Sequence, residues 1–304
     1  MIAVLFVCLM ATACKHDDEE KVDIYASIYP VYYLTTNIVK DKMVVKQVYP
    51  NGRDVHEYDP VSDGDLKNLL KMNDSKLMLY IGAGLEAFIE DAKDKVFADA
   101  KFKLVEISKT IKLYDSITEE MEEDVSNGHI LTADVHMWLD PTIMVSMARI
   151  IAEEVILIDP INEEEYRSNL NDLVNKLKDI DNKYQEALNP IPNKVMLVDH
   201  DAYLYLAKKY NITRIKTRID NESCDISPNK MLEAISQAKE NGIKYIVATK
   251  NETVCSSVNS IKNELGAEVV YLDPIATLTS STLDKDYYDL MLENLEVLKK
   301  IFIK

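Results

Sequence analysis

The sequence predicts an α/β protein of two doubly wound lobes joined by one long, rigid backbone helix. Short, nearly continuous apolar runs alternate with helical segments, as in parallel sheets that are covered on both faces. This alternation occurs in two halves of the chain, and a single amphipathic stretch separates them. The 304 residues are enough for two lobes of about 150 residues each.

The predicted first lobe covers residues 22–158. Ser62 can cap a helix on which Leu66, Leu69 and Leu70 share one face. Asp140 followed by Pro141 has the pattern of a cap at the start of a further helix. The expected order is strand 22–26, helix 31–39, strand 43–49, helix 62–71, strand 77–81, a turn at 82–84 that leads into a helix, and strand 103–107.

The linking helix is predicted within residues 159–190. Apolar side chains recur there in steps of three or four residues, so they form one stripe along a helix over 161–188, and Pro190 and Pro192 stop it. At 1.5 Å per residue this helix is ~42 Å long. A packed helix of this length predicts small, stiff movements of the lobes, unlike a Gly/Ser linker.

The predicted second lobe covers residues 191–304 and repeats the pattern. Ser227 followed by Pro228 marks the start of one helix, and Gly242 marks its end. The expected order is strand 195–198, a helix with Tyr203, Leu206 and Ala207, extended chain 213–216, helix 227–242, strand 245–248, a helix that ends near 266, strand 268–272 and a helix over about 285–301.

The composition excludes several functions. The chain has 52 acidic and 35 basic residues and a formal charge of −17, which argues against binding to nucleic acid. It has seven glycines, and neither the P-loop motif nor the G-x-G-x-x-G motif is present. Phosphate-binding chemistry of those two kinds is therefore not expected.

The amino terminus has the pattern of an export signal. The apolar run over 2–11 is too short to cross a bilayer, and small residues precede Cys14. This arrangement resembles a bacterial lipobox, although no Lys or Arg precedes the run and Ala11 stands where Leu is commoner. We expect a signal peptide over 1–13, lipidation of Cys14 and a tether over 14–21. The alternative is a plain secretory signal.

The remaining cysteines agree with export. Cys8 leaves with the signal and Cys14 takes the lipid, so Cys224 and Cys255 remain as an even pair in an oxidising compartment. We expect a disulfide between them. The alternative is two buried thiols.

The segment 118–133 is rich in acidic residues and contains His129. It shows little periodicity, which is typical of a solvated loop. The alternative is a low-affinity region that gathers cations, because dense carboxylates raise the local cation concentration.

Candidate metal ligands are scattered through the sequence. There are five histidines, and no short-range metal motif is present. His56 follows the second strand, His136 lies at the head of a helix, and His200 and Asp273 each follow a strand of the second lobe. In open α/β sheets such loops line the crevice where ligands bind. Three imidazoles and one carboxylate suit Zn²⁺, whereas the alternative is a set of unrelated structural residues.

Five motifs in this order resemble the zinc/manganese solute-binding lipoproteins of bacterial ABC importers, the cluster A-I type. The likeness covers nearly the whole chain after the signal. The motifs are Y-P-N-G-R-D-V-H-E-Y-D-P at 49–60, Y-I-G-A-G-L-E-A-F at 80–88, H-M-W-L-D-P at 136–141, D-H-D-A-Y-L-Y-L-A at 199–207 and L-D-P at 272–274.

The resemblance implies a metal site in the cleft between the lobes, with His56, His136, His200 and Asp273 as ligands. Manganese carriers of this family tend to have Glu at the third position, so His200 favours Zn²⁺ over Mn²⁺. The implied function is to capture Zn²⁺ at the outer face of the bacterial membrane. The implied partners are an ABC permease and its ATPase, and we expect a monomer that is not an enzyme.

Three alternatives remain open. The cargo of the same transport function could be Mn²⁺. The chain could be a surface adhesin, a role sometimes attributed to relatives. A zinc hydrolase would need an open metal position and a general base, for which Glu57 is the obvious spare residue.

Overall fold

The computed structural model describes residues 21–60, 62–93, 95–97, 100–115, 133–217, 224, 226–250 and 252–303. The predicted signal peptide, Cys14, most of the tether and nearly all of the acidic loop lie outside the described residues. Among the described residues, no helix is both long enough and apolar enough to cross a membrane.

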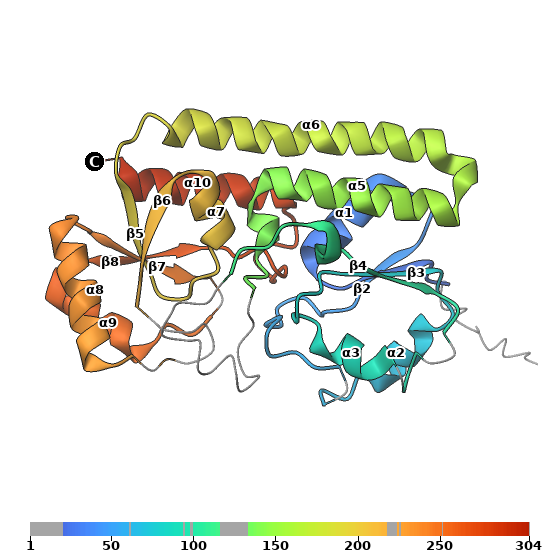
Figure 1. The fold of residues 1–304 in the computed structure, drawn as a ribbon, viewed down its shortest axis with the longest axis horizontal. Helices are drawn as coiled ribbons and strands as arrows, with labels where there is room; N and C mark the ends of the chain where they lie inside the picture. Colours follow the sequence, from blue (N-terminus) through green and yellow to red (C-terminus); the bar gives the residue numbers. More distant parts are fainter. Residues whose placement is uncertain are drawn as a thin grey trace, which may run out of the picture.

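Each lobe is built on a four-stranded parallel sheet (Figure 1). The first sheet has the order β2-β1-β3-β4 and the second the order β6-β5-β7-β8. In each lobe the later strands are therefore added on both sides of the first strand. The prediction of two doubly wound lobes is confirmed. The strands are β1 (Ile24–Ala26), β2 (Val45–Gln47), β3 (Leu77–Tyr80), β4 (Lys103–Glu106), β5 (Lys194–Val198), β6 (Ile212–Lys216), β7 (Tyr245–Thr249) and β8 (Glu268–Leu272).

The order of the strands places the ligand-binding edge. In the first sheet Ala26 of β1 pairs with Gln47 of β2 on one side and with Leu79 of β3 on the other. The loops after β1 and β3 therefore leave in different directions from the same edge. In open α/β sheets this switch point is where ligands bind.

The helices of the first lobe begin later or earlier than the sequence suggests. They are α1 (Tyr29–Val39), α2 (Leu66–Met72) and α3 (Ala87–Lys93). The expected cap at Ser62 is wrong, because α2 begins only at Leu66, after turns in which the N–H of Asp63 donates to the carbonyl of Asp59 and the N–H of Asp65 donates to that of Pro60. Helix α1 starts two residues before the expected position, with Pro30 in its first turn.

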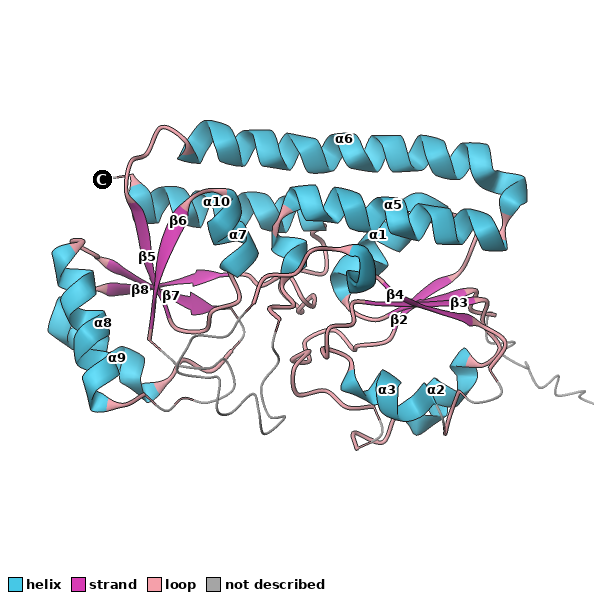
Figure 2. Cartoon of the chain, in the orientation of Figure 1, coloured by secondary structure: helices cyan, strands magenta, loops and turns pink. Residues whose placement is uncertain are grey.

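Two antiparallel helices lie side by side, one spanning both lobes (α6) and the other lying over the first lobe (α5) (Figures 1 and 2). Helix α5 (Pro141–Ile158) is capped by Asp140, whose carboxylate accepts the N–H of Thr142, as expected. Helix α6 (Glu163–Leu188) follows after a short turn and buries its whole predicted apolar stripe. It packs against α1 and α5 of the first lobe, and it confirms the predicted long helix.

The helices of the second lobe are α7 (Leu204–Lys209), α8 (Pro228–Glu240), α9 (Ser256–Leu265) and α10 (Tyr287–Phe302). Ser227 caps α8 by accepting the N–H of Lys230, and Gly266 ends α9 in the left-handed conformation. Helix α10 packs against α6 as well as against β8. The long helix therefore contacts elements of both lobes.

Hydrogen bonds join the two lobes directly. The indole N–H of Trp138 donates to the carbonyl of Pro274 at 2.7 Å, and the hydroxyl of Tyr205 donates to the carbonyl of Asp134 at 2.9 Å. One apolar core includes β1, α1, α5, α6 and α10. Because this core is shared, the boundaries 22–158, 159–190 and 191–304 remain a prediction.

Candidate metal centre

Three imidazoles from separate parts of the sequence meet between the lobes. His56 comes from the loop after β2, His136 lies directly before a 3-10 turn (Met137–Leu139), and His200 lies two residues after β5. Their ligand nitrogens all lie within 4.8 Å of one another, and the two Nε2 atoms of His56 and His136 are 3.2 Å apart. Among the described residues, these three are the group of His, Cys, Asp or Glu side chains whose ligand atoms lie close enough together to hold a metal ion.

The ring of His136 is fixed by a residue of its own turn. The carboxylate of Asp134 accepts the backbone N–H of His136 at 2.8 Å and lies 3.1 Å from its Nδ1. With Nδ1 occupied, Nε2 is the atom that faces His56. Trp138 is fully buried, with its ring 5.3 Å from that of His136, so it packs beside the site.

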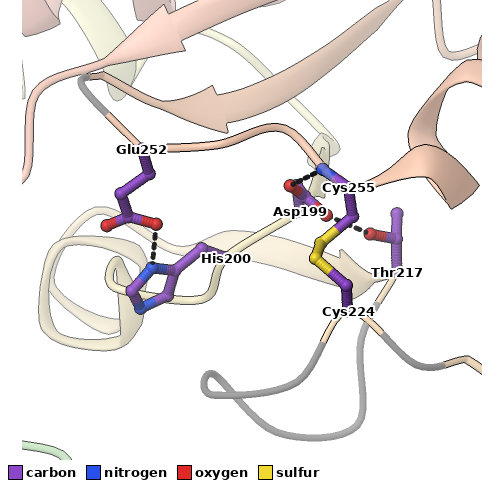
Figure 3. The surroundings of a disulfide bond; sticks show 6 residues. All are labelled: Asp199, His200, Thr217, Cys224, Glu252 and Cys255. Carbon is purple, nitrogen blue, oxygen red and sulfur yellow. Dashed lines mark hydrogen bonds and ion pairs between the residues drawn. A yellow bond between two sulfur atoms is a disulfide. The ribbon is translucent and has the colours of Figure 1, made fainter. Parts of the chain in front are cut away.

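His200 is fixed in the same chemical way by a residue far away in sequence. Its Nδ1 lies 2.5 Å from Oε2 of Glu252 (Figure 3). Its Nε2 is buried and has no hydrogen-bond partner among the residues that the structure describes. A buried nitrogen lone pair without a partner is costly unless a ligand completes it.

His56 is exposed as a residue, but its ring is packed against the other two imidazoles, with ring centroids 5.2 Å from His136 and 6.0 Å from His200. Loss of water around the imidazole lowers the pKa of His56 to about 3, and the neighbouring rings of His136 and His200 lower it further. The ring is therefore neutral near pH 7. A neutral imidazole offers the lone pair that a metal ion needs.

Asp273 is not brought into the set of three imidazoles. Its carboxylate accepts the N–H of Ile275 at 2.8 Å and lies 3.4 Å from the ammonium of Lys250. Burial raises the pKa of Asp273, while Ile275 and Lys250 oppose the shift. The carbonyl of the next residue, Pro274, accepts the indole N–H of Trp138, which is two residues from His136. Asp273 therefore lies in the same region between the lobes as the imidazoles.

Sequence reasoning did not single out Glu252, Asp134 or Lys250. Glu252 and Lys250 follow β7 at the same sheet edge as His200 and Asp273. Their positions shortly after a strand could have identified them from the sequence, since the carboxyl ends of neighbouring parallel strands lie at one edge of the sheet. Asp134 is two residues from His136, where an Asx turn brings a carboxylate to the following N–H.

Comparison with known proteins identifies the family. A family model described as ZnuA, zinc-uptake complex component A, periplasmic, matches residues 24–301. The chain belongs to this family. The resemblance drawn from the five sequence motifs is therefore confirmed.

Relatives of the ZnuA family match most of the chain. The high-affinity zinc uptake system protein ZnuA of Bacillus subtilis is 28% identical over 286 residues, which cover 92% of this chain and 87% of the relative. The zinc-binding protein AdcA of Streptococcus pyogenes serotype M3 is 25% identical over 312 residues, which cover 98% of this chain and 59% of AdcA. The chain thus spans under two thirds of AdcA.

Solved structures agree with the ZnuA-type fold. The metal-dependent lipoprotein YcdH from Bacillus subtilis has a TM-score of 0.77 at 26% identity, covering 93% of this chain and 100% of YcdH. A laminin-binding adhesin, Lmb of Streptococcus agalactiae, has a TM-score of 0.79 at 24% identity, covering 92% of this chain and 99% of Lmb. The likeness to Lmb shows the fold alone.

Proposed function

We propose that this chain is the extracytoplasmic binding component of a zinc importer, and that it captures one Zn²⁺ with His56, His136 and His200. The observation that carries the proposal is the convergence of three imidazoles from distant parts of the chain, in a member of the ZnuA family. The unpartnered Nε2 of His200 points to the same conclusion.

The donor set supports zinc as the cargo. Imidazole nitrogens suit Zn²⁺, whereas Mn²⁺ favours carboxylate oxygens. We assign Asp273 as the fourth ligand, because its buried carboxylate already holds a cation, the ammonium of Lys250. A divalent ion repels that ammonium, so entry of zinc favours exchange of Lys250 for the metal.

Delivery requires a membrane partner. We propose an ABC permease with a cytoplasmic ATPase, and a monomeric binding protein anchored to the outer face of the membrane through Cys14. Binding rather than catalysis follows from the ligand set, because three imidazoles and one carboxylate leave no open position on a tetrahedral Zn²⁺ for a reacting water. No observation favours the hydrolase, manganese or adhesin alternatives over zinc capture.

The first experiment measures the metal directly. Residues 22–304 are purified without chelator, and the metal content and the zinc affinity are measured by elemental analysis and by competition with a chromophoric chelator. We expect one zinc per chain and weaker binding of Mn²⁺. Tighter binding of Mn²⁺, or no tight site for either ion, would contradict the proposal.

His200→Ala tests the ligand assignment. The loss of one of three imidazoles should weaken zinc binding by orders of magnitude. Circular dichroism should stay native, because the ring is a polar group between the lobes whose hydrogen bond goes to the partly exposed Glu252. His129→Ala removes a histidine from outside the trio and is the matched control. Unchanged zinc affinity in His200→Ala would remove this residue from the site.

A further inference from the structure

The segment between β7 and α9 contacts the His200 loop at two points. Glu252 reaches the His200 ring, and three residues later the backbone N–H of Cys255 donates to Oδ2 of Asp199 at 3.5 Å. Asp199 directly precedes His200 and also accepts the hydroxyl of Thr217 at 3.1 Å. Figure 3 shows these side chains, which come from separate loops.

A disulfide ties the same segment to the neighbouring strand. Cys255 is buried at the start of α9 and is bonded to Cys224, which lies beyond the end of β6 (Figure 3). Thr217, the first residue after β6, binds Asp199 from that side. The cystine and the two hydrogen bonds of Asp199 therefore join three loops, those after β5, β6 and β7.

The two buried imidazoles differ in what holds their partners in place. Asp134 is two residues from His136, so a local turn is enough to keep the pair together. Glu252 is 52 residues from His200 and sits on a loop with 22% of its side chain exposed. The position of Glu252 therefore depends on the contacts that hold this loop in place. The Cys224–Cys255 disulfide is one such contact, because Cys255 lies three residues after Glu252.

We propose that Glu252 is the positioning residue that presents Nε2 of His200 to the cargo, and that the Cys224–Cys255 disulfide braces the loop that carries it. The carboxylate holds the proton on Nδ1, so the lone pair of Nε2 faces the centre. Such carboxylate partners orient the ring and make it a better metal ligand. The inference deepens the proposed function and rests on it.

Glu252→Ala tests the positioning role. We expect zinc affinity to fall about 10–100-fold, as is usual when the carboxylate partner of a ligating histidine is lost. Glu252→Gln keeps an acceptor oxygen for Nδ1–H and should stay within a few-fold of wild type. Glu264→Ala removes an exposed carboxylate of the same lobe, paired with Lys239, and should change nothing.

The tautomer of His200, meaning which ring nitrogen carries the proton, distinguishes a positioning role of Glu252 from a purely structural one. Loss of a structural contact alone would leave the tautomer unchanged. Long-range ¹H–¹⁵N spectra of the zinc-free protein should show a proton fixed on Nδ1 in wild type and in Glu252→Gln. A mixture of tautomers is expected in Glu252→Ala. Wild-type zinc affinity together with a wild-type tautomer in Glu252→Ala would overturn the positioning role.

The brace is tested with a double-mutant cycle. Cys224→Ser/Cys255→Ser is compared with wild type, and the same pair is compared in the Glu252→Ala background. If the disulfide acts through Glu252, its removal weakens zinc binding only where Glu252 is present. An equal loss in both backgrounds, or none in either, would overturn the brace. The melting temperature should fall in both backgrounds, because a cross-link is lost.

The same measurements distinguish a failure of the proposed zinc capture from a failure of the positioning role of Glu252. If wild type binds no zinc but its His200 tautomer still depends on Glu252, the positioning role stands and zinc capture fails. If His200→Ala abolishes zinc binding but Glu252→Ala alters neither affinity nor tautomer, zinc capture stands and the inference fails.

Discussion

The convergence of His56, His136 and His200 was predictable residue by residue. Each lies in a loop at the end of a strand or at the head of a helix, and in open α/β sheets such loops meet at the switch point. Their hydrogen-bond partners were not predictable. Glu252 is one of 52 acidic residues, and only folding brings it across 52 positions to His200.

Glu86 is a buried carboxylate that closes the loop after β3. It is 2% exposed, and its two oxygens accept the N–H groups of Ile81 and Gly82, each at 2.9 Å. Gly82 has φ +84°, which a residue with a side chain rarely adopts, and an added Cβ would collide with Glu106. Burial raises the pKa of Glu86 from 4.5 to about 7.

The raised pKa of Glu86 predicts a pH-dependent stability. Between pH 4.5 and 7 the folded protein holds a proton that the unfolded chain has released, so stability falls as pH rises through this window. The change reaches at most about 3 kcal/mol at full burial. Urea unfolding of Glu86→Gln should lose this slope while Glu264→Gln keeps it. An unchanged slope in Glu86→Gln would assign the pH dependence to other groups.

The elements were predictable wherever a hydrophobic pattern defines them. Strand β8 matches the predicted 268–272, and α6 begins only two residues after the predicted 161. The start of α2 was missed because Asp59 and Pro60 organise successive turns that use the N–H groups of the segment around Ser62. A capping residue permits a helix start, but nearby acceptors can direct the backbone into turns instead.

Helix α6 should carry a large share of the stability through its buried stripe. Leu177 lies in the middle of that stripe and is 0% exposed, so Leu177→Ala should cost about 2–5 kcal/mol by leaving a cavity. Leu157, near the end of α5, is 68% exposed, and Leu157→Ala should stay within about 0.5 kcal/mol. Urea unfolding measures both. Similar losses for the two leucines would contradict the packed role of α6.

The whole molecule is held as one body by contacts that cross between the lobes. Tyr287 of α10 donates its hydroxyl to the carbonyl of Trp138 at 2.5 Å, and the indole of Trp138 donates to Pro274. The backbone N–H of Tyr29, at the start of α1, donates to the carbonyl of Ala276 at 3.2 Å. With α6 packed along both lobes, a wide hinge motion would break buried hydrogen bonds and open the shared core.

Trp138 reports on this stiffness because it is the single tryptophan of the chain and lies between the lobes, fully buried beside His136. If the lobes move little, its fluorescence maximum and its quenching by acrylamide should indicate burial both without and with zinc. Zinc should change the intensity only, through the neighbouring imidazole. Tyr287→Phe, which removes one bond across the lobes, should raise acrylamide quenching in the zinc-free protein. A zinc-free wild type with a red-shifted, readily quenched Trp138 would show that the lobes open widely before capture.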